Sequence, residues 1–243
     1  TVKEVEARTM FRRIAEAAWI TGDPGIQFDT TINEWHTCPK SGRINASNPC
    51  SEYMFLDDSA CNLASINLLK YVDQGRFQVR QFAQTVRVMI LAQEIICGFA
   101  KYPTEDIARN SYDFRPLGLG YTNLGALLMV HGIGYDSDPG RRITAALTAL
   151  MHGLANETSG WAASRVGPFA AWKLNEKPML HVLDRHRAAL LDFTECDSPP
   201  VFYASLLRQA RASWDRICVE KIFQQGFRNA QVTLLAPTGT ISF

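Results

Sequence analysis

The chain has 243 residues, of which 47% are hydrophobic, 20% charged and 10% aromatic. This composition is typical of a packed globular protein and excludes a disordered or collagen-like chain. With 25 basic and 24 acidic side chains, the net charge is only +1. Its electrostatic attraction is too weak to recruit nucleic acid or an anionic membrane nonspecifically. Six cysteines are too few for a disulfide scaffold, so we expect reduced thiols and a cytoplasmic protein.

The residue pattern predicts many helices with a few short strands between them, which suits part of an α/β architecture. No run approaches the roughly 18 apolar residues of a membrane-spanning helix. The expected elements, in chain order, are a helix around 10–18 that stops at 21–25, a loop over 26–47, an extended stretch over 53–56, helices over 79–100, 107–111, 121–131 and 139–166, short helical pieces over 169–200, a helix over 205–226 and a strand over 231–235.

Both ends of the chain are unusual for a complete protein. The sequence opens on Thr1, without an initiator methionine, just before a helical pattern. It closes on a predicted strand and a turn, with no further element after them. Because a strand in that place would normally lead into another element, the sequence predicts a fragment of a larger protein.

The segment Asn-Pro-Cys-Ser-Glu at 48–52 carries three different functional groups within five positions. Proline biases the residue before it toward an extended conformation. In an extended chain, alternate residues project to the same side, so Asn48, Cys50 and Glu52 could converge on one ligand. The spacing alone favours the other interpretation, a buried structural cysteine in a turn.

Cys61 follows on a helical or strand-like run, and two nearby thiols could exchange a disulfide in a redox cycle. An alternative is a zinc site in which His36 and Cys38 join Cys50 and Cys61, although their spacing matches no compact Cys-x-x-Cys knuckle.

Four further residues are not expected to take part in chemistry. Cys97 and Cys218 fall on apolar helix faces, where a thiol is usually inert core, and His181 and His186 lie among arginines and are expected at the surface.

Two glycine-containing segments invite comparison with phosphate loops. The turn Ala-Pro-Thr-Gly-Thr-Ile-Ser at 236–242 follows a predicted strand, and such turns expose backbone N–H groups that bind anions. An ordinary exit from a strand has the same composition. Gly118 and Gly120 lack the third glycine of a nucleotide loop, which favours close packing at the start of a helix.

Four stretches together resemble the catalytic subunit of ribonucleotide reductase. They are Asn-Ala-Ser-Asn-Pro-Cys-Ser-Glu-Tyr at 45–53, Ala-Cys-Asn-Leu-Ala-Ser-Ile-Asn-Leu at 60–68, Leu-Gly-Leu-Gly-Tyr-Thr-Asn-Leu-Gly at 117–125 and Asn-Ala-Gln-Val-Thr-Leu-Leu-Ala-Pro-Thr-Gly-Thr at 229–240. The similarity runs in order along essentially the whole chain. The first and last stretches, with the approach at 22–29, favour the class II, adenosylcobalamin-dependent branch. The resemblance implies an α/β fold, with 1–243 as part of a ten-stranded α/β barrel that has a central finger loop over about 45–62.

The resemblance also implies roles for individual residues. Cys50 would be the thiyl radical cysteine that takes the 3′ hydrogen from the ribose. Asn48 would bind the substrate hydroxyls, and Glu52 would remove the 3′-OH proton. Cys61 would be one of two thiols oxidised to a disulfide as the 2′-OH leaves as water. Further substrate contacts would come from Ser47 and from the phosphate-binding turn over about 236–242, at Pro237, Thr238, Gly239, Thr240 and Ile241.

The implied activity is the reduction of ribonucleotides, as di- or triphosphates, to 2′-deoxyribonucleotides for DNA synthesis. The implied cofactor is adenosylcobalamin, and the implied partners are a thioredoxin-like or other dithiol reductant, the remainder of the reductase chain and a second copy in a homodimer of the full protein. Neither nucleic acid nor a membrane is implied, and no metal is expected.

We expect the chain to be inactive alone, because the family's first redox cysteine, its effector site and its C-terminal cysteines lie outside the matching segment. Two alternatives remain at this point. One is a fragment of a class I large subunit, which draws its radical from a partner protein through C-terminal tyrosines, and the other is the non-enzymatic metal-binding module.

Overall fold

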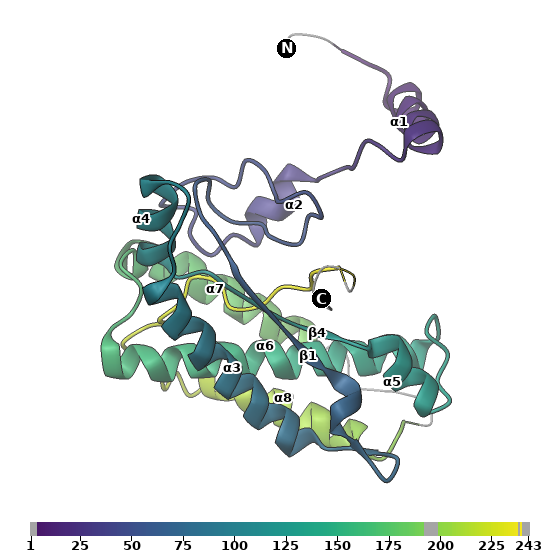
Figure 1. The fold of residues 1–243 in the computed structure, drawn as a ribbon, viewed down its shortest axis with the longest axis vertical. Coiled ribbons are helices and arrows are strands. Elements are labelled where there is room, and N and C mark those ends of the chain that lie inside the picture. Colours follow the sequence, from purple (N-terminus) through teal and green to yellow (C-terminus); the bar gives the residue numbers. More distant parts are fainter. Residues whose placement is uncertain (1–3, 192–198, 238, 240–243) are drawn as a thin grey trace.

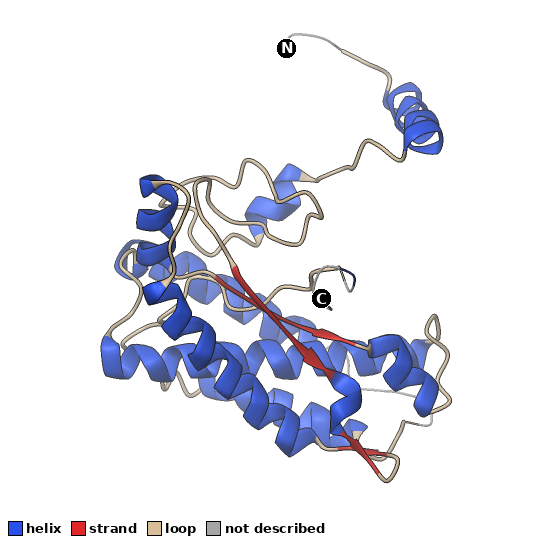
Figure 2. Cartoon of the chain, viewed as in Figure 1, coloured by secondary structure: helices blue, strands red, loops and turns tan. Residues whose placement is uncertain are grey.

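In a computed structural model, residues 4–191, 199–237 and 239 are described, and they form the expected helix-rich α/β fold (Figures 1 and 2). The elements in chain order are α1 (Ala7–Thr21), α2 (Asp29–Glu34), β1 (Asn62–Asn67), a 3-10 helix η1 (Leu68–Tyr71), β2 (Val72–Asp73), β3 (Arg76–Phe77), α3 (Val79–Phe99), α4 (Glu105–Phe114), β4 (Leu117–Thr122), α5 (Leu124–Val130), α6 (Asp138–Val166), α7 (Trp172–Leu191) and α8 (Tyr203–Cys218).

The sheet at the centre of the fold joins three segments that are far apart in the sequence. β1 pairs with β4 in parallel, from Asn62 opposite Leu117 to the far ends of both strands. On the other side of β4, Thr233 forms a parallel bridge with Leu119, and the Leu234 N–H donates to the Leu119 carbonyl at 3.1 Å. The predicted strand over 231–235 is therefore reduced to one bridge, but its hydrogen bonds continue the sheet.

Helices cover this sheet and bury the core. α3 packs against β1, β4 and α6, and α6 packs in turn against α8 (Figure 1). α3 is the one helix in the described ranges that is long and apolar enough to cross a membrane. Its buried Glu94 forms an ion pair with Arg115 at 2.5 Å, and its apolar residues contact the sheet. We therefore assign α3 to the protein core.

Leu117–Thr122 forms a strand, where the sequence predicted the start of a helix. The two glycines of β4 let the neighbouring segments approach closely. A Cβ at Gly118 would lie 2.5 Å from the Cys61 Sγ, and one at Gly120 would lie 2.6 Å from the Leu234 carbonyl oxygen. The close packing expected of these glycines is thus between strands, and α5 begins only at Leu124.

Several predicted boundaries also differ from the structure. In the region predicted as short helical pieces, residues 172–191 form a single continuous helix, α7, with Pro178 inside it. Proline removes one helical hydrogen bond, but Met179, Val182 and Leu183 are buried and α7 packs against α8. α8 ends at Cys218, well before the predicted end at 226, and the predicted loop over 26–47 contains α2.

The first helix is confirmed, and it lies apart from the rest of the described chain (Figure 1). α1 ends at Gly22, whose φ of 82° is a left-handed conformation that glycine adopts easily. None of its residues is buried, and Trp19 is 90% exposed.

Candidate active site

The predicted finger region forms a tight turn that presents Cys50 to solvent. Asn48 closes this turn: its Oδ1 accepts a hydrogen bond from the Tyr53 N–H at 3.0 Å, and its carbonyl accepts one from the Ser51 N–H at 3.0 Å. Ser51 has a φ of 63°, which few residues other than glycine adopt. The expectation of an extended segment with three side chains on one side is therefore wrong, because the backbone reverses at Cys50.

Gln27 and Ser47 brace the base of the turn. The Ser47 hydroxyl donates to the Asn48 carbonyl at 2.8 Å, and the Gln27 amide donates to the hydroxyls of Ser47 and, at 3.1 Å, Ser51. Sequence reasoning did not single out Gln27. Its signal was its place in the 22–29 stretch that contributes to the family resemblance.

Glu52 lies on the inner side of the turn and lines a cavity. Its Oε2 is buried and has no hydrogen-bond partner among the described residues. Buried carboxylate oxygens normally accept hydrogen bonds, so this atom marks a place where a donor group of a ligand would fit.

Cys61 lies just before β1, packed against Gly118 of β4. Burial and the nearby Glu52 carboxylate raise the pKa of the Cys61 thiol to about 12. The thiol is therefore protonated at neutral pH. The structure thus places Glu52 near Cys61, while Cys50 lies at the exposed tip of the turn.

The described part of the predicted phosphate-binding turn begins at the other end of the sheet. Because 231–234 runs parallel to β4, Pro237 follows the carboxyl ends of the strands, whereas Cys61 precedes their amino ends. Pro237 and Gly239 are exposed. Thr238, Thr240 and Ile241 lie outside the described residues.

The residues of the alternative metal site have other partners. The His36 Nδ1 accepts from the Cys38 N–H at 3.3 Å, and the Nε2 lies 3.1 Å from the Gly42 carbonyl. Cys38 is fully buried. Across the described ranges, no group of three or more histidine, cysteine, aspartate or glutamate side chains could hold a metal ion. The metal-binding alternative therefore gains no support.

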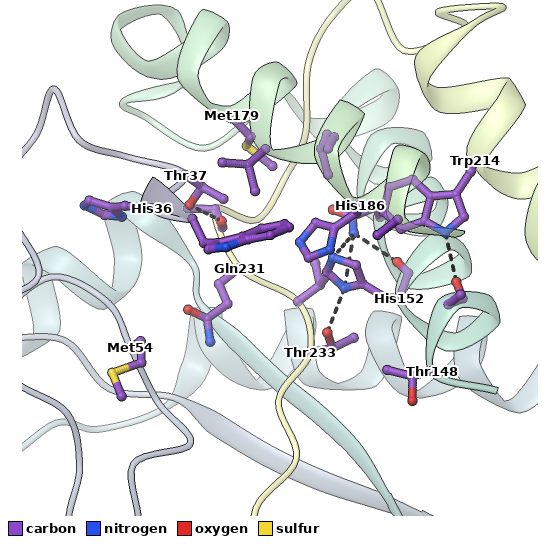
Figure 3. Close-up of a pocket in the computed structure, with 18 of the residues that line it drawn as sticks. His36, Thr37, Met54, Thr148, His152, Met179, His186, Trp214, Gln231 and Thr233 are labelled. Atoms are coloured by element: carbon purple, nitrogen blue, oxygen red, sulfur yellow. Dashed lines mark hydrogen bonds between the residues drawn. The ribbon is translucent and has the colours of Figure 1, made fainter. Parts of the chain in front are cut away.

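A cavity of about 520 Å³ lies between helices α6, α7 and α8 and the segment 230–233 (Figure 3). His152 of α6 is hydrogen-bonded through Nδ1 to the Thr233 hydroxyl at 2.7 Å. Its ring meets the ring of His186 from α7, with the centroids 4.5 Å apart. The Trp214 ring of α8 stacks on His186 at a centroid distance of 5.8 Å.

The expectation that His186 is a surface residue is wrong, because its ring packs between Trp35 and Trp214. A signal for this was present in the sequence. Met179, Leu183, His186 and Leu190 recur every three or four residues, the spacing of one helix face. His181, in contrast, is exposed as expected.

The sequence matches the family of the ribonucleotide reductase barrel domain over residues 1–243. A vitamin B12-dependent ribonucleotide reductase of Rhodopirellula baltica is 57% identical over 98% of this chain and 22% of its own length. One from Streptomyces avermitilis is 46% identical over 99% of this chain and 25% of its own length. A vitamin B12-dependent ribonucleoside-diphosphate reductase of Mycobacterium tuberculosis is 31% identical over 99% of this chain and 28% of its own length.

The chain thus spans about a quarter of the length of these relatives. Because the match with the barrel domain covers the whole length of this chain, and because these relatives are so similar to it, the chain belongs to the ribonucleotide reductase family.

Proposed function

We propose that this chain provides the radical centre of an adenosylcobalamin-dependent ribonucleotide reductase, which converts ribonucleotides to 2′-deoxyribonucleotides for DNA synthesis. The observation that carries the proposal is the exposed Cys50, held on a turn closed by Asn48, next to the inward-facing pair of Glu52 and Cys61. The B12 dependence named for the relatives supports the choice of cofactor.

The residue types suit the steps of this reaction. When bound, the cofactor supplies the initial radical. The Cys50 thiol can yield its hydrogen atom to a radical, and the resulting thiyl can take a hydrogen from carbon. Glu52, whose Oε2 has no partner among the described residues, is suited to accept the 3′-OH proton as a general base.

Cys61 is suited to the reduction itself because its thiol keeps its proton at neutral pH. As the 2′-OH leaves as water and a hydrogen replaces it on carbon, the substrate gains two electrons. Cys61 and a second thiol, contributed by another part of the reductase, lose two electrons and two protons and form a disulfide. A thioredoxin-like protein or another dithiol would then reduce this disulfide.

The surface around Cys50 fits the approach of a large cofactor. Pro49, Cys50 and Ser51 are all exposed, whereas a thiol as deeply buried as that of Cys38 could not be reached. This exposure supports our proposal of a finger loop over about 45–62.

The substrate is a ribonucleoside di- or triphosphate in this proposal. Its phosphates would bind at Pro237, Thr238, Gly239, Thr240 and Ile241, since backbone N–H groups can hold an anion in a chain with a net charge of only +1. Further regions of the reductase would complete the barrel, and we propose a cytoplasmic homodimer for the full enzyme.

The test is a chimera in which this chain replaces the matching 238-residue segment of the Rhodopirellula relative. We expect deoxyribonucleotide formation with a dithiol reductant that requires adenosylcobalamin. Cys50→Ser should lower the rate to less than about a thousandth, because the reacting group is lost. Cys218→Ser, a change on α8, is the matched control and should keep the activity.

Full activity of the Cys50→Ser chimera would contradict the radical role. Activity without cobalamin, but with an added radical-generating subunit, would instead support the class I alternative. The isolated 243-residue chain should show no turnover under either condition.

A further inference from the structure

Cys61 lies at the point where an irregular segment enters the central sheet. The pairing of β1 with β4 begins only at Asn62, so it does not fix the backbone before that residue. Two side chains hold the backbone here. The Ala60 N–H donates to the Ser111 hydroxyl of α4 at 3.0 Å, and the Asn62 carbonyl accepts from the Gln93 amide of α3 at 2.6 Å. The backbone is thus held on both sides of Cys61 by residues that follow 51 and 31 positions later.

Gln93 and Ser111 are polar residues in the core, with exposed fractions of 2% and 0%. A polar side chain at such a depth is costly unless it is hydrogen-bonded. An apolar residue would fill the same space without that requirement. The contacts of these two polar groups with residues 60 and 62 therefore indicate a role in fixing the backbone there.

The contact with Gln93 also bears on the orientation of the thiol. The Cys61 Sγ lies 3.8 Å from the Asn62 carbonyl oxygen, the atom to which Gln93 donates, so the thiol and the amide share one acceptor. A Cβ at Gly118 would lie only 2.5 Å from the Sγ, so the sulfur packs directly against the backbone of β4. A shift of this carbonyl would therefore change how the thiol sits on the sheet.

Neither side chain belongs to the cavity that faces the proposed base. Of the described residues, Glu52 lines this cavity, whereas Gln93 and Ser111 do not. Their contacts are with the backbone beside the thiol. Any effect of the two residues on the reaction would consequently pass through Cys61.

We propose that Gln93 and Ser111 are positioning residues that hold the Cys61 thiol in the geometry required for its oxidation. The proposal rests on the redox role proposed above for Cys61. Reactions between oriented groups are sensitive to displacement, and a shift of about 1 Å can cost about 100-fold in rate. Two hydrogen bonds that fix the backbone beside the thiol oppose such a shift.

The first test measures the thiol itself and requires no turnover. The chimera described above is treated with iodoacetamide, and peptide mass spectrometry follows the modification of each cysteine separately. Gln93→Met and Ser111→Ala each remove one hydrogen bond with little change in volume. Each should raise the modification rate of Cys61 about 5- to 10-fold, the effect of one lost hydrogen bond.

Two other cysteines serve as internal references in the same experiment. Cys50 is exposed, and its rate should not change. Cys38 is fully buried, so its rate reports whether the core as a whole has opened, and it should also stay at the wild-type value. The matched control variants are Gln84→Met on α3 and Ser164→Ala on α6, both at exposed positions, which should leave the Cys61 rate unchanged.

The second test is the rate of deoxyribonucleotide formation by the same chimera. Gln93→Met and Ser111→Ala should each lower kcat about 10- to 100-fold, because the thiol is displaced. KM should change by less than about twofold, since neither side chain lines the cavity. Gln84→Met and Ser164→Ala should keep both values.

Three results would overturn the proposal: a Cys61 rate that neither variant changes, a Cys38 rate that rises together with that of Cys61, and a wild-type kcat for both variants in an active chimera. The second result would show that the two residues support the core in general. A wild-type chimera without turnover would count against the proposed reductase function instead, and the modification rates would still decide whether Gln93 and Ser111 hold the thiol.

Discussion

Glu94 is buried on α3, and hydrogen bonds occupy both of its carboxylate oxygens. Oε1 accepts from the Arg115 Nε at 2.5 Å and from the Arg228 Nε at 2.7 Å, while Oε2 accepts from the Asn229 amide at 2.6 Å. One anion thus holds two cations in a region with little access to water. We call these four residues the Glu94 cluster. It ties the segment before 231–234 to α3 and to the residue that follows α4.

The substitution Glu94→Gln keeps the shape of the side chain but leaves the buried Arg115 and the half-buried Arg228 without a counter-charge. We expect it to reduce the free energy of unfolding by about 3–5 kcal/mol, as measured by denaturant titration. Asp106→Asn breaks an ion pair with Arg109 whose side chains are 60% and 64% exposed, and it should change stability by less than about 1 kcal/mol. Equal losses in the two variants would show that the Glu94 cluster does not stabilise the fold.

At the scale of elements, β4 depends on its glycines. An alanine at Gly120 would place its Cβ 2.6 Å from the Leu234 carbonyl oxygen, a backbone atom that cannot rotate away. We expect Gly120→Ala to cost about 1–3 kcal/mol through strain and to lower the melting temperature. A Cβ at Gly25 would meet nothing within 4 Å, so Gly25→Ala is the control and should cause no loss. A Gly120→Ala variant as stable as this control would argue against the close packing of 231–234 on β4.

Elements with clear boundary residues could be predicted closely from the sequence. α1 ends at the predicted turn residue Gly22, and α6 covers almost the predicted range. β4 could not be predicted, because a six-residue apolar run with two glycines fits a strand or a helix start until its partners are known. α7 could not be predicted because Pro178 indicates a break, whereas burial against α8 outweighs the lost hydrogen bond.

For the site, the resemblance named the residues but not their arrangement. The local rule for extended chains placed Cys50 and Glu52 on the same side, whereas the hydrogen bonds that Asn48 accepts from Ser51 and Tyr53 hold a turn between them. Gln27 lies 20 residues from Ser47 in sequence, and only the folded chain brings the two together. The family resemblance therefore identified the candidate residues, and long-range contacts decided their geometry.

At the scale of the whole molecule, the buried histidines make stability depend on pH. His152 and His186 have pKa values below the ordinary value of about 6.5, because burial disfavours the charged ring. The unfolded chain therefore binds more protons below pH 6.5, and stability falls from there toward about pH 4, where the folded His186 also titrates.

We expect a lower melting temperature at pH 5 than at pH 7. His186→Phe should reduce this difference, because it removes one of the histidines whose pKa burial lowers, a group that also includes His36 and His152. His181→Phe, at an exposed position, should leave the difference unchanged. Melting curves at pH 7, 6 and 5 provide the measurement. A wild-type curve that does not move between pH 7 and pH 5 would contradict the burial of neutral rings.

The Glu94 cluster also sets an order of events during synthesis. Glu94 leaves the ribosome together with α3, but its partners Arg228 and Asn229 follow 134 and 135 residues later. Until they emerge, the carboxylate has Arg115 as its one partner in the cluster, and β4 lacks its neighbour at 231–234. Such distant contacts close slowly and leave apolar surfaces open in the meantime. The nascent chain thus passes through a long interval with an unpaired edge on β4, and this interval ends only when residue 234 has left the ribosome.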